Sequence, residues 1–138
     1  MSKLVSLSEA ASIGIHGMVI IARSKATTVN VNQIAEQTGG SRHHIAKILQ
    51  RLVKDKLLSS NRGPGGGFKL YKPAAEITLL EIYESIEGKV EETHCPLENP
   101  ICSFEKCLLE NIFPKVIKEL RTYLSNQTLD KYIKKSKS

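Results

Sequence analysis

The chain has 138 residues, of which 41% are hydrophobic and 25% are charged, and its formal net charge is +6. This length suffices for one domain, or a small domain with an extension, whose core needs no disulfide bonds. Ser, Glu and His interrupt the apolar run within the first 23 residues. We therefore expect neither a signal peptide nor a membrane span, and we predict a cytoplasmic protein without a membrane partner.

Charge is distributed unevenly along the chain. Residues 1–75 carry eleven Lys and Arg against three acids, a net charge of +8, whereas residues 76–138 carry nine against eleven, a net charge of −2. A basic half can be a solvated surface, but a polyanion such as double-stranded DNA is the partner that it suits best.

The first 60 residues contain the pattern of a helix-turn-helix. Ser6 and Glu9 resemble a capping box that opens a helix ending near Arg23. A second, short helix is predicted over 31–37, and Gly39-Gly40 follows it. Ser41 is a suitable N-cap for a third helix over 42–56, whose apolar residues fall at helical spacing with basic and histidine residues on its other faces.

A glycine-rich hairpin is predicted directly after the third helix. Two β-favouring segments, 57–60 and 68–71, flank a turn that contains Gly63, Pro64, Gly65, Gly66 and Gly67, and Arg62 lies at the foot of this turn. A nucleotide-binding loop would need a Gly-Lys-Ser/Thr ending that opens a helix, which is absent here. A hairpin after a helix-turn-helix is typical of a wing, whose arginine can reach the minor groove or the DNA backbone.

All three cysteines lie within thirteen residues, as Cys95-x6-Cys102-x4-Cys107. In a reducing compartment, clustered thiols bind metal or do redox chemistry more often than they form bridges. Iron-sulfur ligation, a zinc site, a thiol switch without metal and inert buried thiols all remain open on the residues alone. An oxidoreductase is disfavoured because no C-x-x-C pair is present and no base is evident near the thiols, so no enzyme is predicted.

After the cysteines, a long apolar stripe indicates a final helix that Pro114 either kinks or begins. The stripe comprises Leu108, Leu109, Ile112, Phe113, Val116, Ile117, Leu120, Tyr123 and Leu124. It could pack on its own domain, but in so short a chain its length favours a dimer interface. A last short helix over 129–133, capped by Thr128, precedes a basic tail.

The stretch 31–88, with RGPGGGF, EIT and EIYESIEG as its most specific parts, resembles the Rrf2 family of bacterial winged-helix transcription regulators. The resemblance implies a mainly α fold with a small β-hairpin wing and a long dimerisation helix. It further implies a homodimer on a pseudo-palindromic operator. The corresponding division is 1–75 for the winged helix-turn-helix, 76–107 for a connecting helix and cysteine loop, and 108–138 for the dimerisation helix and tail.

Carried over by position, the resemblance implies which residues contact DNA. They are Ser41, Arg42, His43, His44 and Lys47 of the third helix, with Arg62, Gly63, Pro64, Gly65 and Gly66 of the wing. Ala46 stands where some members have a glutamate that influences operator choice, so the operator of those members is not assumed. His43 and His44 could instead be polar surface residues or metal ligands, although adjacent helical residues point about 100° apart and cannot easily share one metal.

The resemblance also favours an iron-sulfur cluster, either [2Fe-2S] or [4Fe-4S], on Cys95, Cys102 and Cys107, since IscR-like and NsrR-like members have a similar loop. Some members carry none. Glu9 matches the place of an amino-terminal aspartate ligand that the partner subunit supplies in some members, but it also fits the capping box with Ser6. Glu110 stands where other members have a histidine ligand, and His94 is a third candidate.

The sequence thus predicts a regulator, expected to be a repressor, in which the cluster senses redox state, nitric oxide or iron-sulfur status. By ordering the loop before the dimer helix, it would bias the spacing of the two recognition helices. The alternative is a cluster-free regulator that responds to a small molecule or a partner protein, or one with a structural zinc or a thiol switch.

Overall fold

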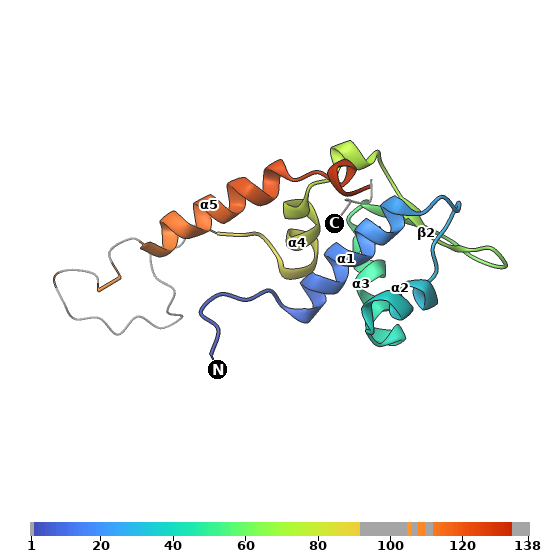
Figure 1. Ribbon diagram of the computed structural model, residues 1–138, viewed down its shortest axis with the longest axis horizontal. Coiled ribbons are helices and arrows are strands. Elements are labelled where there is room, and N and C mark those ends of the chain that lie inside the picture. The colour runs from blue at the N-terminus through green and yellow to red at the C-terminus, as the bar shows by residue number, and fades with distance from the viewer. Residues whose placement is uncertain (1, 92–104, 106–107, 110–111, 134–138) are drawn as a thin grey trace, which may run out of the picture.

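The computed structural model describes residues 2–91, 105, 108–109 and 112–133 and shows a mainly helical chain with one β-hairpin (Figure 1). The elements are α1 (Glu9–Arg23), α2 (Val31–Thr38), α3 (Arg42–Lys54), β1 (Leu58–Asn61), β2 (Gly67–Leu70), η1 (Ala74–Glu76), α4 (Leu79–Glu87), α5 (Ile112–Asn126) and η2 (Leu129–Tyr132), of which η1 and η2 are short 3₁₀ helices. The predicted fold class is confirmed. None of the described helices is long and apolar enough to cross a membrane.

Helix α1 begins two residues later than the sequence pattern indicated. Its N-cap is Ser8, whose Oγ accepts a hydrogen bond from the Ala11 amide at 3.0 Å, so the predicted capping box of Ser6 with Glu9 is wrong. Ser8 is favoured over Ser6 as the N-cap because its hydroxyl also donates to the Glu87 carboxylate at the end of α4. Sequence spacing cannot reveal this contact. Glu9 is therefore the first residue of the helix, with no capping partner to explain it.

Helices α2 and α3 form the predicted helix-turn-helix. Asn30 caps α2 in a capping box with Gln33, and Ser41 Oγ caps α3 by accepting from the His44 amide at 3.3 Å. Helix α3 ends at Lys54, slightly before the predicted end, because Asp55 forms the C-cap and Lys56 adopts a left-handed φ of 62°.

The hairpin wing is antiparallel, with Leu58 paired to Leu70 and Asn61 paired to Gly67. Each strand is shifted by one residue from its predicted bounds. A third segment joins it: Val29, just before α2, exchanges two backbone hydrogen bonds with Phe68 of β2 at 2.9 and 2.8 Å. The wing is thus tied to the chain that enters the helix-turn-helix.

One apolar core unites the helix-turn-helix with the later elements. Its fully buried side chains include Met18 of α1, Ile34 of α2, Leu49 and Leu52 of α3, Ile82 of α4 and Leu129 of η2. Burial of this kind stabilises by about 1.5–3 kcal/mol for each large aliphatic side chain. Helix α4 and the 3₁₀ helix η2, which follows α5, therefore pack into the same core as the helix-turn-helix and the wing.

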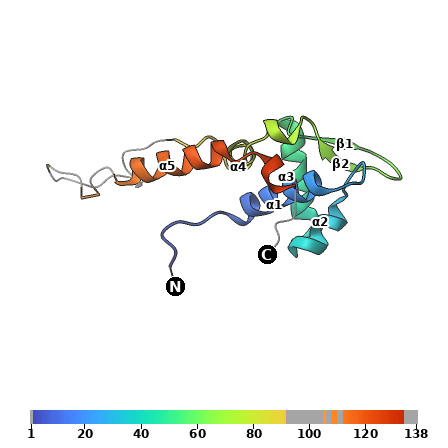
Figure 2. The ribbon, with the colours of Figure 1, turned by 45° about the horizontal axis from the view of Figure 1, so that its top comes forward.

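Backbone hydrogen bonds just after the C-terminal end of α5 anchor it to the rest of the described chain. Leu79 at the start of α4 donates to the Gln127 carbonyl, and Leu129 donates to the Ile77 carbonyl, both at 2.9 Å. From this anchor α5 extends away from the body, opposite the hairpin (Figures 1 and 2). Pro114 lies in the first turn of α5, where its missing N–H is tolerated. It therefore marks the start of the helix and does not kink it, which was one of the two predicted alternatives. The predicted last helix forms as the 3₁₀ helix η2.

Candidate nucleic-acid interface and its flanking elements

The N-terminal half of α3 presents a polar, basic surface. Ser41, Arg42, His43 and Lys47 are exposed and His44 is partly buried, while Ile45, Ile48 and Leu49 face the core. The structure thus places the predicted helix residues in the N-terminal half of α3, although Ser41 Oγ already accepts the capping hydrogen bond. Helix α3 carries four cations, at Arg42, Lys47, Arg51 and Lys54, and all four are exposed.

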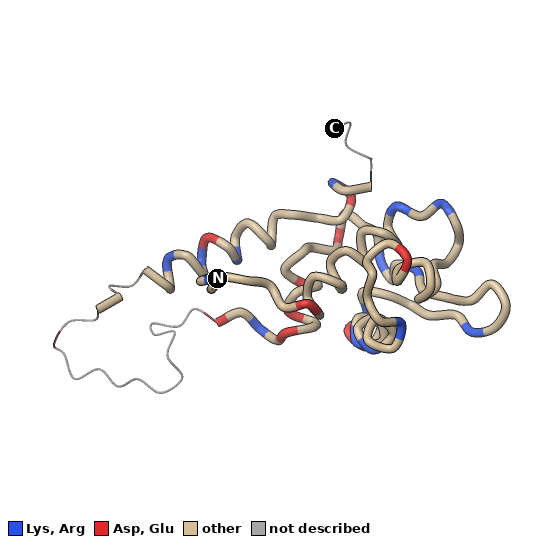
Figure 3. The backbone as a smooth tube through the Cα atoms, turned by 60° about the horizontal axis from the view of Figure 1, so that its bottom comes forward, with Lys and Arg blue, Asp and Glu red and all other residues tan. Residues whose placement is uncertain are grey.

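Within the described ranges, ion pairs join Arg51 to Asp55 at 3.8 Å and Lys72 to Glu81 at 2.9 Å. Arg42, Lys47 and Arg62 take part in neither pair, so their charge is available to an external anion. Figure 3 shows Lys and Arg around the helix-turn-helix and hairpin, and Asp and Glu along the chain that leaves α4. This separation agrees with the charge asymmetry of the sequence.

The tip of the wing is a turn in which Gly63 and Gly65 adopt positive φ, of 89° and 76°, and in which close approach requires glycine at 66 and 67. The Gly66 amide donates to the Gly63 carbonyl at 2.8 Å, and a Cβ on Gly66 would lie 2.4 Å from the Asn61 carbonyl oxygen. A Cβ on Gly67 would lie 2.7 Å from the Val29 carbonyl oxygen. Arg62 is exposed at the base of this turn, where a side chain can reach past the hairpin.

A contact that sequence reasoning missed holds the tip in place. Thr28 Oγ1 donates to the Gly65 carbonyl oxygen at 2.8 Å, across 37 residues of sequence. The sequence indicated only a polar break at Thr27 and Thr28, because no local pattern reveals a partner so distant along the chain.

Cys95, Cys102 and Cys107 lie outside the described residues, as do His94 and Glu110. Within the part of the chain that is described, no group of three His, Cys, Asp or Glu could hold a metal ion. Glu9 is exposed on the first turn of α1. The contact of its neighbour Ser8 with Glu87 places it near the end of α4, from which the chain continues to the cysteines.

That end of α4 is bonded to α3 and its C-cap. Arg51 Nε donates to the Ser85 carbonyl oxygen at 2.9 Å, and Ser85 Oγ donates to the Asp55 carboxylate at 2.5 Å. Ser85 is 6% exposed and is a buried polar residue of the described core. A few residues later the Val90 amide donates to the Glu84 carboxylate at 2.8 Å, which holds the chain where it leaves the helix.

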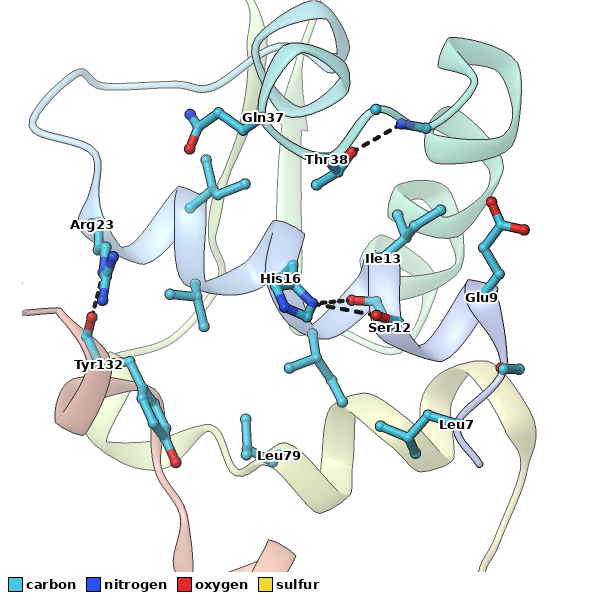
Figure 4. A pocket seen from close by; sticks show the side chains of 16 residues that line it. Leu7, Glu9, Ser12, Ile13, His16, Arg23, Gln37, Thr38, Leu79 and Tyr132 are labelled. Atoms are coloured by element: carbon cyan, nitrogen blue, oxygen red, sulfur yellow. Dashed lines mark hydrogen bonds between the residues drawn. The ribbon is translucent and has the colours of Figure 1, made fainter. Parts of the chain in front are cut away.

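A groove of about 950 Å³ runs along α1, between the α2–α3 turn and the elements α4 and η2 (Figure 4). Much of its wall is apolar, with Ile15, Val19, Ile20 and Leu79. Two of its polar side chains have partners: Arg23 Nε donates to the Tyr132 carbonyl at 2.5 Å, and His16 Nδ1 donates to the Ser12 carbonyl at 2.7 Å. Partial burial, with smaller contributions from Tyr123, raises the pKa of Tyr132. No pattern in the sequence indicated this groove.

The described part of α5 has no buried residue, although the predicted apolar stripe runs along it. Ile112, Val116, Leu120 and Tyr123 are 49%, 37%, 46% and 57% exposed, so a large apolar surface faces solvent in the single chain. Leu108 and Leu109, which were expected to share the stripe, precede the helix and are also exposed.

Comparisons with known proteins agree with this geometry. The model of the Rrf2 family, described as iron-dependent transcriptional regulators, matches residues 7–135. The transcriptional regulator IscR of Escherichia coli O1:K1 is 32% identical over 110 residues, which are 80% of this chain and 68% of that protein.

Solved structures share the fold. The global cysteine regulator CymR of B. subtilis superimposes with a TM-score of 0.75 at 20% identity, covering 94% of this chain and 97% of that one. IscR of T. potens superimposes with a TM-score of 0.73 at 23% identity, covering 92% of this chain and 85% of that one.

Proposed function

The chain belongs to the Rrf2 family and is a DNA-binding transcriptional regulator, and from this premise we propose that an iron-sulfur cluster on its cysteines controls operator binding. We take the protein to be a homodimeric repressor on a pseudo-palindromic site. The observation that carries the DNA-binding part is the exposed basic face of α3 beside a hairpin with an exposed arginine, joined in one body.

In this proposal the N-terminal half of α3 enters the major groove. Arg42, His43, His44 and Lys47 are placed to contact base edges or phosphates, and Ser41 lies at the helix N-terminus, whose partial positive charge favours a phosphate. Ala46, at the position where some family members have a glutamate that influences operator choice, is half-buried on this helix. We therefore expect the operator sequence to depend on the side chains of this chain and not to copy the operator of a relative.

The wing supplies a second contact. Arg62 extends from the glycine turn of residues 63–66 toward the adjacent minor groove, where a narrow A·T-rich segment has an enhanced negative potential. Gly63, Pro64, Gly65 and Gly66 allow the backbone to approach the DNA closely, since three of these four residues carry no side chain.

Two copies are proposed to associate through α5, within the dimerisation segment 108–138. The exposed apolar stripe supports this, because a 15-residue helix with no fully buried residue in its own chain gains stability from a partner's apolar face. Isologous pairing of two such helices would place two α3 helices about a two-fold axis, which matches a pseudo-palindrome.

The donor set suits a cluster of the [2Fe-2S] or [4Fe-4S] type. Cys95, Cys102 and Cys107 supply three thiolates, the usual ligands of such clusters, and leave one coordination position for another residue. Glu9 is proposed for that position, from either subunit, because it lacks the capping role and lies near the end of α4. When bound, the cluster supplies redox-active iron that nitric oxide or oxygen can attack.

The presence or absence of a cluster on the cysteines would affect DNA binding through α4. The chain enters the cysteine segment just after Glu91, and the end of α4 is bonded to α3 through Ser85. A change in the cysteine segment would therefore alter both the position of α3 and the spacing of the two α3 helices in a dimer. This linkage is the proposed route of regulation.

A second candidate is a cluster-free regulator that responds to a small molecule or a partner protein. The groove along α1 favours it, because this open and largely apolar concavity lies between the helix-turn-helix and α4. A structural zinc or a thiol switch on the cysteines belongs to the same alternative.

Selection of high-affinity sites from random double-stranded DNA tests the proposed function. We expect a two-fold symmetric consensus whose half-sites are about one helical turn apart, 10 to 10.5 base pairs. A consensus without symmetry would contradict the dimeric mode, and failure to enrich any sequence would contradict specific operator binding. The same selection with cluster-loaded and cluster-free protein reports whether the cysteines affect site choice.

A further inference from the structure

We propose that Thr28 is a positioning residue that holds the wing tip in its DNA-contacting place, so that Arg62 depends on it. The inference rests on the proposed contact of the wing with the minor groove. It adds a residue outside both the recognition helix and the wing, at a position where the sequence indicated only a break between two helices.

Three consecutive residues connect the wing to the helix-turn-helix. Thr28 Oγ1 donates to the Gly65 carbonyl at the tip, Val29 exchanges two backbone hydrogen bonds with Phe68 in β2, and Asn30 caps α2. Val29 is 2% exposed, which fixes this short segment against the core. Residues 28–30 therefore hold the tip at a defined position relative to the start of α2.

The tip needs such a tie. Strand pairing ends at the Asn61–Gly67 pair, so residues 62–66 lie beyond the ladder, and three of them are glycines with high conformational freedom. The turn contains its own backbone hydrogen bond between Gly66 and Gly63, which closes the loop but does not fix it relative to α2. The Thr28 hydroxyl provides the side-chain link from the tip to another part of the described chain.

This link affects Arg62 because the arginine precedes the turn that Thr28 holds. Without the hydroxyl, the tip would sample more orientations in the free protein, and binding would have to order it at an entropic cost. The expected effect is a loss of operator affinity of about three- to tenfold, the worth of one net hydrogen bond. Binding by α3 to non-specific DNA should be unaffected.

The chain offers matched variants. Thr28→Val removes the hydroxyl but keeps the β-branched shape, and Thr28→Ser keeps the hydroxyl. Thr27→Val makes the same chemical change at the exposed neighbour. Arg62→Ala removes the group that the tip is proposed to deliver.

The test is a double-mutant cycle on the full chain, with operator affinity and A·T preference beneath the wing measured by footprinting titration. We expect Thr28→Val to weaken binding about three- to tenfold when Arg62 is present and to have little effect in the Arg62→Ala background. Thr28→Ser should restore wild-type behaviour, and Thr27→Val should match wild type.

Two outcomes would overturn the role of Thr28. The first also removes the proposed contact of the wing with DNA, whereas the second leaves that contact in place. If Arg62→Ala alone leaves affinity and A·T preference unchanged, the wing contact fails and the role of Thr28 fails with it. If Arg62→Ala weakens binding but Thr28→Val does not, or weakens it equally in both backgrounds, the wing contact stands and Thr28 does not position it.

Discussion

Arg51 in the recognition helix donates a hydrogen bond from Nε to the backbone carbonyl oxygen of Ser85 in α4, at 2.9 Å and across 34 residues of sequence. The Ser85 hydroxyl in turn donates a hydrogen bond to the carboxylate of Asp55, the C-cap residue of α3. The helix proposed to read DNA is thus bonded, at its C-terminal end, to the helix that leads into the cysteine segment.

Ser85→Ala tests this connection. It removes the bond to Asp55 while leaving the Ser85 backbone carbonyl in place, so we expect unfolding free energy to fall by only about 1 kcal/mol, since the exposed Asp55 carboxylate can be hydrated instead. The ratio of operator affinities between the cluster-loaded and cluster-free protein should move toward one. Chemical denaturation and operator titration in both states measure the two quantities.

Glu81→Gln is the matched control, because Glu81 also makes a polar contact from α4, but to Lys72, which lies outside α3. It should leave the affinity ratio unchanged. An unchanged ratio in Ser85→Ala would show that the cysteine state does not reach α3 through this contact.

Lys47→Ala tests the face of α3. If Lys47 neutralises a phosphate, its loss should lower affinity similarly for all sequences and reduce the slope of log affinity against log salt by about 1. Lys118→Ala, an exposed cation on α5, should leave the slope unchanged. A loss confined to one base-pair position would instead assign Lys47 to base recognition.

Leu120→Asp tests the dimer interface. Leu120 lies in the middle of the exposed stripe of α5, and a buried unpaired carboxylate costs several kcal/mol, so dimer affinity should fall by about a hundredfold or more. Sedimentation should show monomers, and operator affinity should fall with dimerisation. Thr122→Asp adds the same charge on another face of the helix and should remain dimeric. Intact dimers of Leu120→Asp would place the interface elsewhere.

The sequence predicted local features of the fold well. Helical spacing and a serine N-cap located α3, and the glycine cluster located the wing, because these signals depend on residues within one turn or one hairpin. The position of the α1 cap was missed for the opposite reason, since the contact of Ser8 with Glu87 spans 79 residues. The same limit hid Thr28 and Ser85, whose partners lie far along the chain.

In the proposed site, too, the sequence predicted local features but not long-range contacts. Composition and spacing pointed to the basic face and the cysteines, whereas the way in which the two communicate depends on packing of α4 against α3. Side-chain identity alone does not specify such contacts. The assignments of Cys95, Cys102 and Cys107 to a cluster, and of Glu9 to its fourth position, stay predictions.

An iron-sulfur cluster on the three cysteines is proposed to control specific DNA binding. The most direct measurement is operator affinity of anaerobically purified protein, with iron, sulfide and zinc assayed on the same samples, before and after treatment with nitric oxide or oxygen. Cys95→Ala, Cys102→Ala and Cys107→Ala are measured alongside. We expect wild type to contain iron and sulfide and to change its operator affinity on treatment, while each variant loses visible absorbance and this response but keeps salt-dependent non-specific binding. Glu9→Ala should have a milder effect. Stoichiometric zinc without sulfide, or an identical specific affinity in all these preparations, would contradict the account.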